Sequence, residues 1–251
     1  SSLNASYLKN EVTKLSAQTP RLYGEKPALG TVDPCTIIQE GEAIGTFYGF
    51  KWAGLQKNDK GQWVDTYYKS NGTITTDPDA STDRFILGHS NPDFTFGWNN
   101  TVTYKNWDFN MFCNAAFGAK RLNIVRYVMN AEVGASMFAT DKDYFDNVGI
   151  TMPTIGAENK TYGNSDKWLE NADYFRCENI SIGYTFPRSV LKFADLRLTL
   201  SCQNLFTITS YKGMDPAGAS FSDKNVDNNN GIDMGVYPNP RTFTFGVRMN
   251  F

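Results

Sequence analysis

The sequence of 251 residues has little histidine and no excess of basic residues. Its single histidine is His89, and 24 lysines and arginines are set against 26 aspartates and glutamates. One histidine excludes a metal site with two His ligands, and a net charge of −2 lacks the cationic excess by which proteins bind nucleic-acid phosphates. We interpret His89, within Gly88-His89-Ser90, as a turn residue before a strand rather than the base of a hydrolase. The sequence therefore predicts neither an enzyme nor a nucleic-acid partner.

Long hydrophobic runs are also missing. No window approaches the roughly 18 consecutive apolar residues of a membrane-spanning helix, which excludes a helical membrane protein. Charged residues make up 20% of the chain, below the roughly 25% usual in soluble domains, while aromatic residues reach 14%. Part of the surface is therefore expected to face something other than water. A transmembrane β-barrel stays open, because its strands alternate apolar and polar residues and give only a weak hydropathy signal.

The four cysteines form no Cys-x-x-Cys pair and are separated by gaps of 78, 64 and 25 residues; they are Cys35, Cys113, Cys177 and Cys202. This spacing excludes a zinc knuckle and a dense disulfide framework. We interpret these cysteines as scattered small apolar residues in strands. The chain starts at Ser1 without an initiator methionine or a signal sequence, so either a secretion signal has been removed or the chain is an internal fragment, and we expect the fragment.

Strict alternation of apolar and polar residues is the main structural signal. In the last eleven residues, Phe243, Phe245 and Val247 share one face and Thr242 and Thr244 share the other. The same period recurs in four further segments, and a segment rich in glycine and aromatic residues is a looser sixth candidate. The four segments are 94–104, 107–117, 174–186 and 194–206, and the looser candidate is 43–54. Alternation alone is also typical of a soluble sandwich.

The lengths of the connections favour a membrane barrel. Short connections at 105–106 and 187–193 alternate with long ones at 55–92, 118–172 and 207–239. Long loops are uncommon in compact soluble domains, whereas outer-membrane barrels have short periplasmic turns and long extracellular loops. The long and short connections fall on consistent sides if the C-terminus ends at the periplasmic face. The predicted fold is all-β: an antiparallel transmembrane β-barrel segment of about six long strands.

Six strands cannot close a membrane barrel, because such barrels have at least about eight strands and an open edge would leave backbone groups unpaired in lipid. We therefore expect further strands before Ser1. We divide the chain into a barrel-associated segment, 1–42, and the C-terminal part of the barrel, 43–251. Within the first segment we expect a short helix over 3–15 and a loop over 17–34.

Several motifs carry a resemblance to a known family. In chain order they are Gly45-Thr-Phe-Tyr-Gly-Phe-Lys51, Gly88-His-Ser-Asn-Pro-Asp-Phe94, Asp173-Tyr-Phe-Arg176 with Gly183-Tyr-Thr-Phe-Pro187, Gln203-Asn-Leu-Phe206 with Tyr211-Lys-Gly-Met-Asp-Pro216, and Tyr237-Pro-Asn-Pro-Arg241. Over 43–251 the chain resembles the C-terminal part of the SusC-like TonB-dependent outer-membrane transporters. The terminal Phe251, with apolar residues at alternate positions before it, resembles the assembly signal of outer-membrane barrels.

The resemblance implies an outer-membrane barrel of about 22 strands. It implies import of glycan or peptide nutrients under a SusD-like lipoprotein lid, driven by TonB through a part of the protein that this chain lacks. The resemblance implies no cofactor. The alternative that we keep is a soluble or surface-attached β-rich protein that binds carbohydrate.

Aromatic residues in the expected loops are the candidate contacts for substrate or lid, because their rings can stack on sugars or pack on peptide side chains. They are Trp63, Tyr67, Tyr68, Trp168 and Tyr211. Each could instead pack within its own loop. Trp98, Tyr104 and Trp107 are expected to form an interfacial aromatic girdle.

An acidic segment lies near the C-terminus, at residues 227–233. Asp227-Asn-Asn-Asn-Gly-Ile-Asp233 spaces oxygen ligands about a glycine, as calcium sites do, but it lacks the later Glu of an EF-hand. A polar loop tip is the interpretation that we favour, and we predict no metal ligand in this segment.

Overall fold

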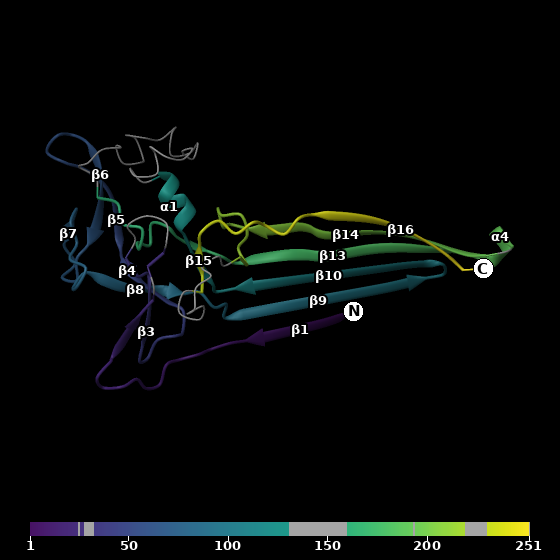
Figure 1. The fold of residues 1–251 in the computed structure, drawn as a ribbon, viewed down its shortest axis with the longest axis horizontal. Helices are drawn as coiled ribbons and strands as arrows, with labels where there is room; N and C mark the ends of the chain where they lie inside the picture. Colours follow the sequence, from purple (N-terminus) through teal and green to yellow (C-terminus); the bar gives the residue numbers. More distant parts are fainter. Residues whose placement is uncertain (25, 28–32, 131–159, 193, 219–229, 251) are drawn as a thin grey trace.

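A six-stranded antiparallel sheet, which we call the wall, is the largest feature of the computed structural model (Figure 1). The structure describes residues 1–24, 26–27, 33–130, 160–192, 194–218 and 230–250. The strands of the wall follow the order β1-β9-β10-β13-β14-β16. Their bounds are Ser2–Tyr7 (β1), Phe94–Tyr104 (β9), Trp107–Phe117 (β10), Tyr174–Phe186 (β13), Asp195–Thr209 (β14) and Thr242–Asn250 (β16). The all-β antiparallel prediction is confirmed.

Two neighbouring rows of residues across the wall show how the alternation of the sequence builds two different faces. Because side chains point to opposite faces at successive positions of a strand, adjacent rows belong to opposite faces. One row is apolar and runs Val102, Phe109, Ile182, Leu200, Phe245 across five strands. The next row is polar and runs Thr101, Asn110, Ser181, Ser201, Thr244. The register of the strands therefore separates an apolar face from a polar face.

The apolar face of the wall is open. On β16, Phe243 is 67% exposed, Phe245 is 66% exposed and Val247 is 58% exposed. Across the part of the chain that the structure describes, no second sheet or helix covers this row (Figure 1). Large rings in such an arrangement require an apolar solvent, because a contiguous apolar patch of this kind is rare on a soluble monomer. The sandwich alternative, which needs these rings to be buried, does not describe this arrangement.

The ends of the wall differ, as the connection lengths predict. The turn between β9 and β10 uses only Lys105 and Asn106, with Lys105 in the left-handed region at φ 53°. The short helix α4, Arg188–Leu191, lies between β13 and β14 at the same end (Figure 1). Tyr104 is the register partner of Trp107, and the ring of Trp107 lies 4.7 Å from that of Tyr184. These aromatic residues lie beside the short turn, where the interfacial girdle is expected.

Smaller sheets gather at the opposite end of the wall, and together with helix α1 they form what we call the cap (Figure 1). The sheet orders are β2-β3-β4-β8, β5-β6-β7 and β12-β11-β15. The bounds of the cap elements are Arg21–Tyr23 (β2), Thr36–Gln39 (β3), Thr46–Phe50 (β4), Trp52–Lys57 (β5), Trp63–Tyr68 (β6), Ile74–Thr75 (β7), Arg84–His89 (β8), Lys120–Asn123 (β11), Ile124–Asn130 (α1), Leu169–Asn171 (β12) and Ile232–Asp233 (β15).

The cap has a hydrophobic core of its own, built from residues far apart in the sequence. Its buried members are Cys35, Phe47, Leu122, Ile124, Tyr127, Trp168 and Ile232. Burying such side chains stabilises a fold by about 1.5–3 kcal/mol each for the large apolar ones. The long connections are therefore folded structure where they are described. Among the described residues, no helix is long and apolar enough to cross a membrane.

Two local predictions are wrong. The helix expected over 3–15 is instead strand β1, whose residues pair with β9 from Ser2 opposite Asn99 to Tyr7 opposite Phe94. The segment 43–54 supplies strands to the cap rather than the sixth strand of the wall, because β4 is buried along its whole length between β3 and β8. The connection from β1 to β9 is therefore longer than the predicted loop 55–92.

A pair of neighbouring substitutions on β16 tests the assignment of the two faces. Phe245→Arg places a charge on the apolar face, and we expect it to cost about 2–4 kcal/mol if the position lies near the membrane midplane. Thr244→Arg adds the same side chain to the polar face, beside Ser201, and we expect normal assembly. The measurement is the folded fraction of the full-length protein in outer membranes, by heat-dependent gel mobility. Equal tolerance of both arginines would contradict the assignment.

Candidate functional site

The polar face of the wall carries a bidentate ion pair near the short-turn end. Arg197 Nη1 donates to Asp108 Oδ1 at 2.6 Å, and Nη2 donates to Oδ2 at 2.7 Å. The two residues belong to β14 and β10, so the pair spans β13 at Gly183. A Cβ atom on Gly183 would lie 2.6 Å from Arg197 Nη2, so a larger residue there would displace the guanidinium group. This side of the wall can hydrogen-bond water and polar solutes.

A cluster of charged and hydroxyl groups joins the wall to the cap, and we call it the junction cluster. Its members are Arg121, Arg176, Tyr211, Asp215 and Asp233, all buried. Arg176 Nη2 donates to Asp215 Oδ1 at 2.5 Å, and the Tyr211 hydroxyl donates to Asp233 Oδ2 at 2.5 Å. Burial, followed by the bond to Asp233, raises the pKa of Tyr211, so this hydroxyl stays protonated. The second basic member of the cluster, Arg121, donates from Nη1 to the Ser90 carbonyl at 2.8 Å.

The motifs that carry the family resemblance meet in this region. Arg176 belongs to one motif and Asp215 to another, and their ion pair connects them. Gly49, in the first motif, has the carbonyl oxygen of Asn164 only 1.7 Å from the place a Cβ would take. Any other residue would therefore push apart the contact in which Phe50 N donates to that carbonyl at 2.9 Å. These motif residues therefore fix contacts between segments that are far apart in the sequence.

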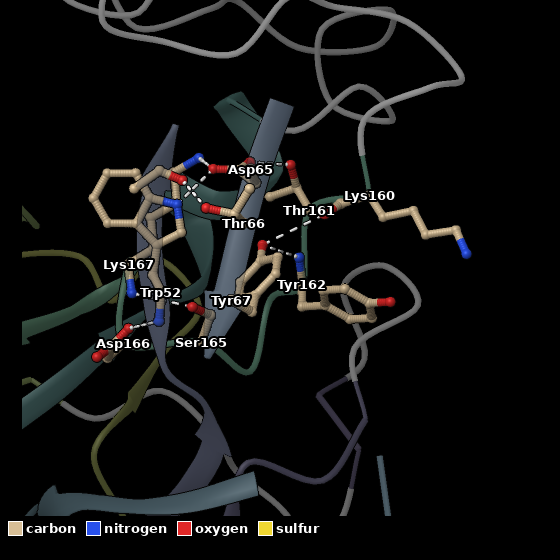
Figure 2. Close-up of polar contacts among 11 residues, drawn as sticks. Trp52, Asp65, Thr66, Tyr67, Lys160, Thr161, Tyr162, Ser165, Asp166 and Lys167 are labelled. Atoms are coloured by element: carbon tan, nitrogen blue, oxygen red, sulfur yellow. Dashed lines mark hydrogen bonds and ion pairs between the residues drawn. The ribbon is translucent and has the colours of Figure 1, made fainter. Parts of the chain in front are cut away.

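A second buried network, which we call the clasp, holds the segment after residue 159 against β6 (Figure 2). Asp65 is its centre: Oδ1 accepts from Lys167 Nζ at 2.6 Å and from Trp52 Nε1 at 2.8 Å, and Oδ2 accepts from Thr161 Oγ1 at 2.7 Å. The side chains of Asp65 and Lys167 are 0% and 8% exposed. Burial lowers the pKa of Lys167, and the adjacent carboxylate opposes that change. Sequence patterns gave no sign of the clasp, because its members are far apart in the chain.

The structure does not bring the five predicted contact residues together. Trp168 belongs to the core of the cap and Tyr211 to the junction cluster. Tyr67 is fully buried, and its ring packs at 5.2 Å against the ring of Tyr162. The observed placement of these three residues agrees with the alternative prediction, in which the aromatic side chains pack within the protein. Contact of any of the five with substrate or lid stays a prediction.

Trp63 and Tyr68 are the two predicted contacts that keep some exposure. They are five positions apart on β6, so the alternation of the strand directs them to opposite faces. Each has a lysine over one ring face: Lys57 Nζ lies 5.3 Å from the Trp63 ring, and Lys51 Nζ lies 5.7 Å from the Tyr68 ring. A ligand could therefore stack on only one face of each ring, and not on both rings at once.

A cavity of about 330 Å³ lies between helix α1 and the segment after β14. Val125, Met129 and Met214 supply apolar lining, and Arg126 and Lys212 supply charge. Arg126 Nη1 also donates to Glu170 Oε1 at 3.1 Å. A pocket that combines apolar walls with a few polar groups is the usual form of a small-molecule site. Lys212 and Met214 belong to one of the resemblance motifs, but sequence reasoning did not predict a cavity here, because its lining comes from segments without an alternating pattern.

The acidic segment 227–233 is described only in part, since residues 227–229 lie outside the described ranges. The carboxylate of Asp233 is used within the protein: besides Tyr211, the backbone amide of Gly235 donates to its Oδ1 at 2.8 Å. Among the residues with described positions, no three His, Cys, Asp or Glu side chains are grouped so that they could hold a metal ion. His89 is the last residue of β8 rather than a turn residue, and its Nδ1 lies 2.8 Å from the Asn91 carbonyl oxygen.

Comparison with known proteins relates the whole chain to one group of receptors. It is 33% identical over 270 aligned residues to the TonB-dependent receptor P3 of Formosa agariphila, with 99% of this chain and 26% of that protein covered. It is 27% identical to the TonB-dependent receptor SusC of Bacteroides thetaiotaomicron, with 100% of this chain and 24% of that protein covered. The chain thus spans about a quarter of the length of these relatives. No protein-family model matches the sequence.

The fold is also that of solved structures. The RagAB peptide importer in its open-open state superposes with a TM-score of 0.77 at 23% identity, covering 99% of this chain and 26% of the other. The RagAB peptide transporter gives a TM-score of 0.72 at 21% identity and covers the same share of this chain. These relationships confirm the predicted family, the barrel segment, the outer-membrane location and the interpretation that the chain is not an enzyme.

Two lysines of one segment provide a matched test of the clasp. Lys167→Met leaves the Asp65 carboxylate buried without its cation, and removing one partner of a buried ion pair costs about 3–5 kcal/mol. Lys160→Ala removes the exposed pair with Asp77, with side chains 57% and 64% exposed, and such pairs contribute about 0–1 kcal/mol. The measurement is the rate at which proteinase K cleaves the cap of the full-length receptor in outer membranes. Equal rates for the two variants would contradict the stabilising role of the clasp.

Proposed function

We propose that this segment of a SusC-like TonB-dependent receptor forms part of the wall and mouth of an importer for glycan or peptide nutrients. The observation that carries the proposal is the two-faced wall, which has an open apolar face and a polar face. In the proposed arrangement the apolar face would meet lipid and the polar face would line an aqueous lumen. The folded cap then stands on the extracellular side, at the end of the wall opposite the short turns (Figure 1).

The class of cargo follows from the chemistry available on the polar face and in the cap. Amide, hydroxyl and carboxylate groups of the wall suit solutes rich in hydrogen-bonding groups, which describes both oligosaccharides and peptides. The resemblance to SusC-like transporters implies the same two classes, and one solved structure with the same fold is named a peptide importer. Trp63 and Tyr68, the predicted contacts that keep some exposure, are the residues that such a solute would meet.

The proposed partners are a SusD-like lipoprotein that closes the mouth and the TonB complex that supplies energy. The lipoprotein would rest on the cap, since the cap is the folded structure at the mouth. TonB would act through a part of the protein that lies outside this chain. The relatives are about four times as long as this chain, so they have room for such a part.

Uptake by cells tests the proposal. Cells that produce the full-length receptor with its neighbouring lipoprotein are given fluorescent oligosaccharides or fluorescent oligopeptides of similar size. We expect receptor-dependent uptake of one class, and we expect a protonophore to abolish it because TonB draws on the proton gradient. Uptake of neither class above that of cells without the receptor would contradict the proposal, as would recovery of the full-length receptor in a detergent-free aqueous fraction.

A further inference from the structure

Three of the four cysteines lie on neighbouring strands of the wall. Cys113 is on β10, Cys177 on β13 and Cys202 on β14. Cys113 and Cys177 are direct register partners, whereas Cys202 is the partner of Ile180. Both residues are free, buried cysteines in the structure. The fold therefore selects one pair among the possible pairings, although these two residues are far apart in the sequence.

The geometry of an antiparallel pair suits a covalent bond between these two thiols. Directly opposed residues have Cα atoms about 4.5–5.5 Å apart, and disulfides accept separations of about 4.4–6.8 Å. Cross-strand Cβ atoms lie about 4.5–5.5 Å apart, slightly beyond the usual disulfide range of about 3.5–4.5 Å. Closure thus needs a small approach of β10 to β13. The register of β10 with β13 shifts beside this pair, between Phe112 and Cys113, so the ladder is locally irregular there.

Access limits when the bond can form. In the folded wall Cys113 is 2% exposed and Cys177 is 1% exposed, so an oxidant in water does not reach them. An outer-membrane protein crosses the periplasm before it folds, and the bacterial periplasm is an oxidising compartment. The two thiols are accessible to an oxidant at that stage, before folding of the wall buries them.

We propose that Cys113 and Cys177 form a cross-strand disulfide during assembly, which fixes the register of β10 and β13 at the irregularity. One thiolate attacks the disulfide of a periplasmic protein oxidant and forms a mixed disulfide, releasing one oxidant thiolate. The second thiolate attacks the cysteine sulfur of that mixed disulfide and releases the other. The two cysteines lose two electrons and two protons in total, and the oxidant leaves as a dithiol. The bond closes a long loop, which restricts the unfolded chain.

The test is peptide mapping of the full-length receptor from outer membranes. The receptor is denatured in iodoacetamide without reductant, digested, and analysed by mass spectrometry. We expect a linked peptide pair that contains Cys113 and Cys177 and weighs two hydrogens less than the separate peptides, with Cys35 and Cys202 alkylated. Because the map is made on the unaltered protein, the result does not depend on whether a variant folds.

Variants provide the matched controls. We expect Cys113→Ser and Cys177→Ser to lose the linked pair entirely, and Cys35→Ser and Cys202→Ser to keep it. Alkylation of all four cysteines in the unaltered protein would overturn the proposal. A link between Cys177 and Cys202 would overturn it as well, because the register places Cys202 opposite Ile180.

Discussion

The constraint on which the structure depends is that a backbone inside hydrocarbon must hydrogen-bond to itself while its side chains meet two different solvents. An antiparallel sheet satisfies the backbone, and the period of two along each strand sorts the side chains. In the wall the register aligns this sorting across strands, so that Phe245 continues the row of Leu200 and Thr244 the row of Ser201. A shift of one residue at any strand would exchange the faces of that strand.

The same constraint explains why this chain is a segment of a larger structure. Strands β1 and β16 are at the two edges of the wall, each with one strand partner among the described residues. Unpaired backbone groups at such edges cost several kcal/mol each in lipid, so both edges must meet further strands of the barrel. The relatives, about four times longer than this chain, have the length to supply them.

The cap is held by a different kind of interaction from the wall. Its contacts join residues far apart in sequence through a hydrophobic core and through two buried polar networks, the clasp and the junction cluster. Buried ion pairs give little net stability relative to apolar replacements, but losing one partner is costly. In the cap, we infer that such networks favour a single arrangement of the long connecting segments. This arrangement would keep the mouth of an importer in a defined shape.

The long strands of the wall could be predicted from sequence, and the cap could not. The ranges 94–104 and 107–117 agree with β9 and β10, because alternation between lipid and water marks both strands clearly. Strand β1 was missed because Ser2–Tyr7 is short and its polar residues are small. Strand β4 was assigned to the wrong sheet, since burial on both sides removes alternation from Thr46–Phe50. The clasp depends on contacts between distant segments, which no local pattern records.

The most direct test of the account is to measure what surrounds each side chain of β16. Single spin labels at positions 242 to 249 of the full-length receptor in a bilayer would report collisions with oxygen, which concentrates in lipid, and with a water-soluble nickel chelate. We predict that oxygen accessibility is high at 243, 245, 247 and 249 and that nickel accessibility is high at the positions between them. Low accessibility to both reagents at all eight positions, as in a packed protein interior, would contradict the account.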